Sequence, residues 1–165
     1  MPEVIDQDHT PRSRVGLASS MLLAGAAGLI AFEVVARFIT PVMFGAHPLL
    51  GRFVALATGL DFVANVAVIH VLTGLLVLPT VYVLTIRRLG TWILPGMPWW
   101  GSAAGYAVFI WIISQAAVLR IPGGAQDVPS LTGNALASFF AYAAYAMTLG
   151  AVAHLLRTWR PAGAP

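Results

Sequence analysis

The stretch LDFVANVAVIHVLTGLLVLPTVYVLTI, residues Leu60–Ile86, decides the fold. At about 1.5 Å per residue, a helix of this length spans roughly 40 Å, enough to cross a bilayer core of about 30 Å with some tilt. The run is too long and too apolar for an ordinary core helix. It also holds the residues that are unusual in lipid: Asp61, Asn65, His70 and Pro79. Ionisable groups inside lipid are costly, so each of them needs a partner or a function.

The composition extends this interpretation to the whole chain. Its 165 residues are 59% hydrophobic and only 9% charged, whereas about a quarter of the residues in a soluble domain are charged. All nine basic residues are arginines, and they lie at the ends of apolar runs, as membrane anchors do, so we expect no nucleic-acid partner. The chain has no cysteine, which excludes disulfides, thiolate metal sites and cysteine nucleophiles.

The apolar runs predict an all-α, polytopic membrane protein with four transmembrane helices in a bundle. We expect a four-helix transmembrane domain over 15–157, between a flexible cytoplasmic tail, 1–14, and a short C-terminal tail, 158–165. The predicted spans are about 15–39, 59–86, 99–121 and 131–156.

The arginines predict the orientation. An even number of spans puts both termini on one side, and that side holds Arg12, Arg14, Arg87, Arg88, Arg157 and Arg160. The other side holds Arg37, Arg52 and Arg120. The positive-inside rule therefore favours cytoplasmic N and C termini. We expect a multi-pass protein of the bacterial inner membrane, with membrane lipids around it.

Small residues recur at helical spacing in two of the predicted spans. The first span carries Gly16, Ser20, Ala24 and Gly28, and the third carries Gly101 and Gly105 in a G-x-x-x-G pattern. Such stripes let helix backbones approach closely. They favour tight packing within the bundle, and contact with a different subunit is the alternative.

Polar residues on several spans share the outer half of the predicted bilayer: Glu33, Arg37, Asp61, Asn65, Gln115 and Asn134. Glu33 and Arg37 are four residues apart and so lie on one helical face, as an ion pair at the lipid boundary or as a functional carboxylate held by an arginine. The whole cluster either satisfies its own hydrogen bonds and locks the bundle, or lines a cavity for a polar headgroup or a quinone ring.

His70 is the one candidate for cofactor binding. Counting from the outer end of its span, it lies about 16 Å deep, near mid-membrane. It is either hydrogen-bonded within its own surroundings, where Thr73 and Gly74 share its face, or it acts as a proton relay or haem ligand. His154 falls about 35 Å along its span, at the cytoplasmic surface, so the two do not fit one bis-histidine haem. No metal or catalytic motif is present.

Three segments carry a loose family resemblance: HVLTGLLVLPTVY (His70–Tyr82), LPGMPWWGSAAGY (Leu94–Tyr106) and IPGG (Ile121–Gly124). They resemble bacterial four-helix inner-membrane proteins of the YagU-like, largely uncharacterised kind. The resemblance covers about a third of the chain and implies a membrane bundle without a defined activity. By analogy, small proteins of this appearance also occur as accessory subunits of respiratory complexes, such as haem-copper oxidases.

These observations predict a non-catalytic accessory or assembly subunit of a larger bacterial membrane complex, by analogy a respiratory complex of the haem-copper oxidase type. The chain itself is then no enzyme, although it could be a subunit of one. The alternatives are a small oligomeric transporter or proton-conducting protein that uses the outer-half polar cluster, and a membrane cytochrome or quinone-reactive enzyme. No cofactor is predicted, and contact with lipid or quinone stays open.

Overall fold

The computed structural model describes residues 14–46, 48, 63–120 and 131–158. These residues form helices joined by short turns, and no strand occurs among them. The predicted all-α fold is therefore confirmed. Residues 1–13 and 159–165 of the predicted tails, with His47 and most of the loop before the second span, lie outside the described residues.

The first long helix consists of α1 (Arg14–Val34), the π-helical turn η1 (Val35–Ile39) and α2 (Thr40–Phe44). It continues one turn beyond the predicted end at residue 39, although Pro41 interrupts the hydrogen-bond ladder. Gly45 ends it in the left-handed conformation, with φ of 60° and its N–H bonded to the Pro41 carbonyl at 3.0 Å. This is the usual glycine termination of a helix.

The second long helix comprises α4 (Val63–Leu72), the π turn η2 (Thr73–Val77), α5 (Leu78–Val81), the π turn η3 (Tyr82–Ile86) and α6 (Arg87–Ile93). It runs past the predicted end at residue 86 because neither of the two arginines that follow breaks a helix. The chain turns only at Pro95–Gly96, where Gly96 adopts a φ of 86°. Pro79 lies inside this helix, directly after η2.

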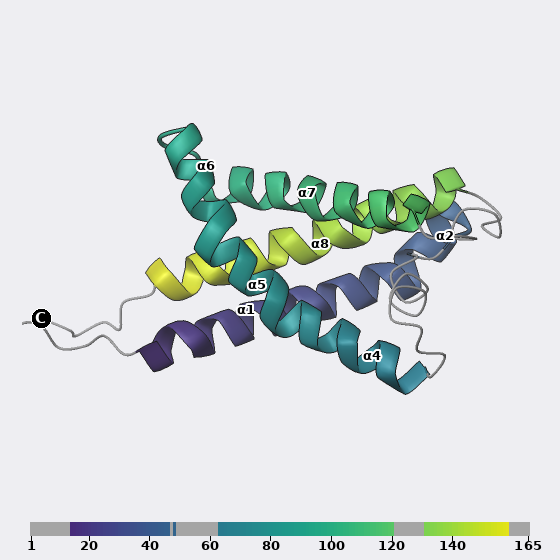
Figure 1. The fold of residues 1–165 in the computed structure, drawn as a ribbon, viewed down its shortest axis with the longest axis horizontal. Coiled ribbons are helices and arrows are strands. Elements are labelled where there is room, and N and C mark those ends of the chain that lie inside the picture. The colour runs from purple at the N-terminus through teal and green to yellow at the C-terminus, as the bar shows by residue number, and fades with distance from the viewer. Residues whose placement is uncertain (1–13, 47, 49–62, 121–130, 159–165) are drawn as a thin grey trace, which may run out of the picture.

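Two uninterrupted helices complete the bundle, α7 (Trp99–Arg120) and α8 (Leu131–Thr158). α8 packs against both α1 and α7, while the second long helix crosses α1 at η2 and α5 and reaches α7 at η3 and α6. Figure 1 shows α1, α7 and α8 running in similar directions, with the second long helix inclined across them, so that α4 diverges from α7. The start of α1, the end of α8 and α6 all lie at the same end of the molecule.

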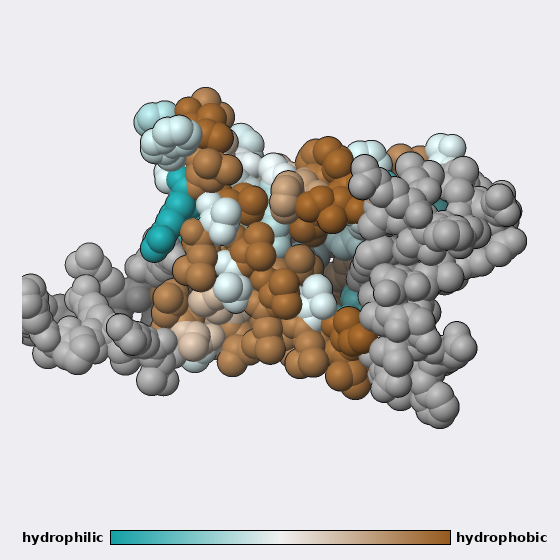
Figure 2. All heavy atoms as spheres, viewed as in Figure 1, coloured by the Kyte–Doolittle hydropathy of each residue, from teal (hydrophilic) through white to brown (hydrophobic). Residues whose placement is uncertain are grey.

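Three helices are long and apolar enough to cross a membrane: Gly16–Phe44, Ala67–Ile93 and Thr132–Leu156. Within the described residues α7, the third predicted span, is not among them. The surface agrees with a lipid environment, since Figure 2 shows a largely hydrophobic face across the middle of the bundle and hydrophilic atoms near α6.

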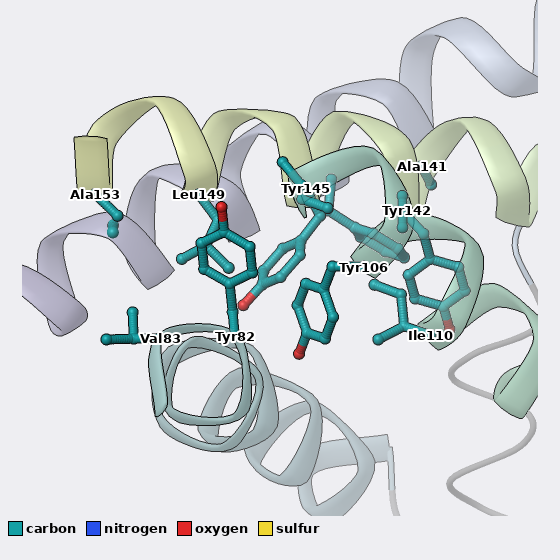
Figure 3. Close-up of a cluster of buried hydrophobic side chains, with 14 of the residues drawn as sticks. Tyr82, Val83, Tyr106, Ile110, Ala141, Tyr142, Tyr145, Leu149 and Ala153 are labelled. Atoms are coloured by element: carbon teal, nitrogen blue, oxygen red, sulfur yellow. The ribbon is translucent and has the colours of Figure 1, made fainter. Parts of the chain in front are cut away.

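The core is built from alanines and tyrosines. Ala137, Ala141 and Ala146 of α8 are fully buried, and their small side chains allow the neighbouring helices to come close. Tyr82, Tyr106 and Tyr145 are the largest buried side chains, with at most 1% of their surface exposed. Figure 3 shows their rings gathered between α8 and the second long helix.

Candidate functional site

An ionic network joins the first two long helices. Glu33 of α1 accepts a hydrogen bond from Arg37 Nε through its Oε2 at 2.6 Å, and its Oε1 lies 2.8 Å from His70 Nε2 on α4. Glu33 and Arg37 are one helical turn apart, whereas His70 is brought to them by the crossing of the helices. Because the carboxylate is paired with Arg37 and can only accept, the His70 Nε2 carries the proton in this bond, which leaves Nδ1 as an acceptor in the neutral ring.

The exposure of the three side chains decreases from Arg37 to His70. Arg37 is 73% exposed, Glu33 is 31% exposed and His70 only 18% exposed. Phe32 covers one side of the imidazole, with the ring centroids 5.4 Å apart. The network therefore leads from the surface of the bundle to an imidazole that is largely enclosed.

His70 lines a cavity of about 240 Å³ that lies among all the long helices. Its wall is nearly all apolar or aromatic, and Phe32, Tyr106, Phe109, Tyr142 and Tyr145 supply the rings. The remaining polar groups in the wall are His70, Thr73 and Ser114. The cavity is partly open, and Phe109 and Ile113 of its wall are 43% and 52% exposed.

The helix beside the cavity is held by a tyrosine hydroxyl. In η2 the Leu78 N–H bonds to the Thr73 carbonyl, five residues back. The next acceptor in that register is the Gly74 carbonyl, but Pro79 has no N–H to give it. The Tyr145 hydroxyl of α8 donates to the Gly74 carbonyl instead, at 2.6 Å. A bond between helices thus replaces the one that proline removes.

Two more tyrosines fix the same helix. Tyr106 of α7 donates to the Leu78 carbonyl at 2.8 Å, and the Tyr82 hydroxyl lies 3.0 Å from Ser102 Oγ. The rings of Tyr82 and Tyr106 also contact one another, with centroids 5.4 Å apart. In Figure 3 the three hydroxyl-bearing rings of Tyr82, Tyr106 and Tyr145 lie together, with Tyr142 further along α8. The bonds from Tyr106 and Tyr145 hold one wall of the cavity in place, and they use the hydroxyl hydrogens of both side chains.

The structure brings together only part of the predicted polar cluster. Glu33 and Arg37 pair with each other and with His70, which was predicted separately. Gln115 is half-buried on α7 and Asn134 is buried on α8. Asp61 lies outside the described residues, and so does the side chain of Asn65.

The predicted small-residue stripes have mixed surroundings. Ala24 and Gly28 are buried, and a Cβ on Gly28 would come within 3.1 Å of the Tyr145 ring. Gly16 is exposed and accepts the Ser20 hydroxyl at 2.6 Å. On α7 a Cβ at Gly101 would meet Met97, whereas one at Gly105 would have no neighbour within 4 Å.

The closest helix approaches involve glycines that the stripes do not include. A Cβ on Gly25 would come within 2.6 Å of Pro79 Cγ, and one on Gly74 within 2.9 Å of Leu29. Gly150 of α8 similarly faces Ala103 at 2.8 Å. Gly25 and Gly74 therefore set how closely α1 can approach η2.

The second histidine of the described residues lies elsewhere. His154, near the end of α8, stacks on Trp99 with ring centroids 5.9 Å apart, at the end of the bundle where α6 lies. No group of three His, Asp or Glu side chains that could hold a metal occurs in the described part of the chain.

The sequence analysis did not predict the hydrogen bonds by which Tyr82, Tyr106 and Tyr145 hold the second long helix, although two signals for them were present. All four tyrosines of the chain fall inside apolar helices, where each hydroxyl needs a partner. Pro79, inside another such helix, leaves a carbonyl that needs a donor. No protein-family profile, curated protein or solved structure matches the chain.

Proposed function

We propose that the chain crosses the bacterial inner membrane four times, with α7 as a further span beside the three apolar helices and both ends in the cytoplasm. At about 1.5 Å per residue, α7 is roughly 33 Å long, which is sufficient for a bilayer core. The start of α1 and the end of α8 lie at the same end of the bundle (Figure 1). Arg87 and Arg88 of α6 are also at that end, in agreement with the positive-inside rule.

We infer that the bundle binds a lipophilic molecule with a polar ring, of the quinone or hydroquinone class, in the cavity beside His70. The observation that carries this proposal is the combination of an aromatic, partly open cavity with the Glu33–His70–Arg37 network at its wall. Ligand pockets are typically apolar with a few placed polar groups. The cavity has this character.

The size of the cavity favours a substituted ring. A dry apolar cavity of about 150 Å³ already accommodates benzene, and this one measures about 240 Å³. An isoprenoid tail would leave past the exposed side chains of Phe109 and Ile113, into lipid. The ring would lie among the aromatic side chains of Phe32, Phe109 and Tyr142, where offset stacking contributes to binding.

The polar groups suit a ring that carries a hydroxyl or carbonyl oxygen. In its neutral form the His70 ring offers Nδ1 as an acceptor to a hydroquinone hydroxyl, and in its charged form it offers the Nδ1 hydrogen to a quinone carbonyl, while Glu33 holds its other nitrogen. Ser114 donates to the Trp111 carbonyl at 2.8 Å and is also hydrogen-bonded to the Tyr142 hydroxyl, so it is already engaged within the bundle. The Tyr106 and Tyr145 hydroxyls bond to backbone carbonyls, which leaves His70 as the main group for orienting a ligand.

Binding is tested with ubiquinone-1 on the full chain in dodecyl maltoside, by quenching of tryptophan fluorescence. We expect saturable binding of one quinone per chain, which farnesol, an isoprenoid without the ring, does not compete away. His70→Phe keeps an aromatic side chain but removes the nitrogens, and we expect about tenfold weaker binding. No saturable quenching by wild type would overturn the proposal.

Two neighbouring isoleucines provide a matched control. Ile113 lines the cavity, whereas Ile112 does not, and they are 52% and 54% exposed. Ile113→Trp should fill the mouth of the cavity and abolish binding, while Ile112→Trp should leave it within a factor of two or so. Equal effects of the two substitutions would show that the quinone partitions into detergent around the helices.

We further propose that the chain serves a larger membrane complex as a non-catalytic subunit that holds this ligand. The support is chemical: most polar groups of the cavity are already bonded within the bundle, so the site is suited to binding rather than turnover. Purification in a mild detergent followed by native mass spectrometry should give the chain in a defined assembly with other membrane proteins. Recovery of the chain alone under these conditions would contradict this role.

The Glu33–His70 contact favours a second candidate, proton conduction. A carboxylate and an imidazole in hydrogen-bond contact inside a span are the usual elements of proton relays. Proton flux into liposomes should then disappear in both Glu33→Gln and His70→Phe, with the protein still folded. Unchanged flux in either variant would remove this candidate without affecting the binding proposal.

A further inference from the structure

A second pocket lies at the other end of the bundle, where α6, α7 and α8 meet. It measures about 360 Å³ and is lined by Arg87, Thr91, Met97, Trp99, Ser102 and His154. Unlike the cavity beside His70, its wall combines two basic side chains with two hydroxyls and one indole. Such a mixture is suited to an anion and not to an apolar ligand.

Within the described part of the chain, no carboxylate lies beside Arg87 at this end. Glu33 is the only carboxylate among the described residues, and it pairs with Arg37 and His70 at a different site. Arg87 is half-buried and Arg88 next to it is exposed, so Arg87 is the one whose guanidinium helps enclose the pocket. A half-buried arginine is stabilised by an anion that binds it bidentately.

The walls of the pocket are held in place by contacts within the bundle. The Trp99 indole stacks on the His154 imidazole at 5.9 Å between ring centroids. Ser102 Oγ donates to the Trp99 carbonyl at 2.8 Å, and Thr91 Oγ1 donates to the Arg88 carbonyl at 2.9 Å. The His154 imidazole is therefore presented by a fixed surface, with Arg87 on α6 lining the same pocket.

The position of the pocket points to the headgroup layer. Trp92 and Trp100, close to it in sequence, are 79% and 56% exposed, as tryptophans at a membrane–water interface are. Figure 2 shows hydrophilic atoms gathered near α6, beside the hydrophobic face. Basic pockets between membrane helices on the cytoplasmic side bind the phosphates of anionic lipids.

We propose that this pocket binds a phosphate group, held by Arg87 and His154 and covered by Trp99. The phosphate comes either from the headgroup of an anionic glycerophospholipid or from a small soluble phosphate compound. The proposal rests on the membrane topology proposed above, but it is independent of the ligand in the cavity beside His70.

The test uses the full chain, delipidated in dodecyl maltoside, with three probes measured by isothermal titration calorimetry. They are dihexanoyl phosphatidylglycerol, inorganic phosphate, and dihexanoylglycerol, which has the same acyl chains without the phosphate. We expect saturable binding of the phosphatidylglycerol and none of the dihexanoylglycerol. Tighter binding of the lipid than of inorganic phosphate identifies a lipid headgroup as the source, and equal binding identifies a soluble phosphate.

Arg87→Gln and Arg88→Gln form a matched pair, since they remove the same charge from adjacent residues and only Arg87 lines this pocket. We expect Arg87→Gln to weaken phosphate binding at least tenfold and Arg88→Gln to weaken it less than about threefold. Helical circular dichroism checks that both variants are folded. Equal losses in both, or no binding of either phosphate probe to wild type, would overturn the proposal.

Discussion

The π turns η1 and η2 are each followed by a proline, Pro41 and Pro79, that leaves one backbone carbonyl without an N–H donor. The two carbonyls receive replacement donors in different ways. In η1 the Thr40 N–H bonds to the Val35 carbonyl, and Pro41 then leaves the Ala36 carbonyl without its N–H. The Thr40 hydroxyl, from the same helix, donates to Ala36 at 3.1 Å. In η2 the equivalent carbonyl, that of Gly74, is reached by Tyr145 from a different helix.

This difference shows which turn is completed by its own helix and which one needs a side chain from a neighbouring helix. The turn at Pro41 lies near the end of the first long helix and is satisfied by its own residues. The turn at Pro79 lies inside the second long helix, and its hydrogen bonding is complete only when α8 is docked. The wall of the cavity beside His70 therefore forms together with the tertiary packing.

The largest expected effect on stability comes from a substitution that pushes α1 away from η2 and Pro79. Gly25→Val places a Cβ where Pro79 Cγ lies 2.6 Å and the Leu75 carbonyl 2.8 Å away. We expect it to lower the free energy of unfolding by about 3 kcal/mol, measured by SDS titration in mixed micelles, or to prevent folding. Gly105→Val, at a glycine with open space around it, is the control and should change stability by less than about 0.5 kcal/mol.

Removing the bridging hydroxyl should have the next largest effect. We expect Tyr145→Phe to cost about 1–2 kcal/mol, above the average of about 0.6 kcal/mol for hydrogen bonds between membrane helices, because the Gly74 carbonyl has lost its own N–H donor. Tyr106→Phe should cost less, since the Leu78 carbonyl also accepts the Tyr82 N–H. The same SDS titration measures both variants, and a larger loss for Tyr106→Phe would contradict this account.

The turn at Pro41 should be less sensitive to the loss of the hydroxyl that replaces the missing N–H donor. Thr40 is fully buried, and Thr40→Val keeps its shape while removing the hydroxyl. We expect a loss of roughly 0.5–1 kcal/mol in the same titration, because only a bond within one helix is lost. A cost above that of Tyr145→Phe would reverse the proposed contrast between the turns.

The smallest effect is the most specific. Pro79→Ala restores an N–H for the Gly74 carbonyl, so the Tyr145 hydroxyl becomes partly redundant. In a double-mutant cycle, Tyr145→Phe should cost about 0.5 kcal/mol less in the Pro79→Ala background than in wild type. Additive losses would mean that the hydroxyl does not compensate for the proline.

The sequence was sufficient to predict the long helices, but not the places and angles at which they cross. Long apolar runs predicted the four long helices of the described residues, though not that the first two extend through α2 and α6, since length and hydropathy are local properties of the chain. The Glu33–Arg37 pair was also predictable, because a spacing of four residues places both side chains on one helical face. The approach of His70 to Glu33 was not, because it depends on the angle at which the two long helices cross.

The glycines show the same limit. A stripe of small residues, such as Gly16, Ser20, Ala24 and Gly28, marks one face of a helix without saying where another helix touches it. The closest contacts are at Gly25 and Gly74, where helices cross at a point rather than along a stripe. The position of Pro79 opposite Gly25 sets that point, and it is a property of the packed bundle.

The central claim is that the cavity beside His70 holds a ring-bearing lipophilic molecule, and purification from native membranes tests it most directly. Wild type, Ile113→Trp and Ile112→Trp would be purified in a mild detergent, extracted with organic solvent and analysed by mass spectrometry. We predict about one quinone-class molecule per chain in wild type and in Ile112→Trp, and almost none in Ile113→Trp. The same mixture of bulk phospholipids in all three preparations, without a ring-bearing molecule, would contradict the account.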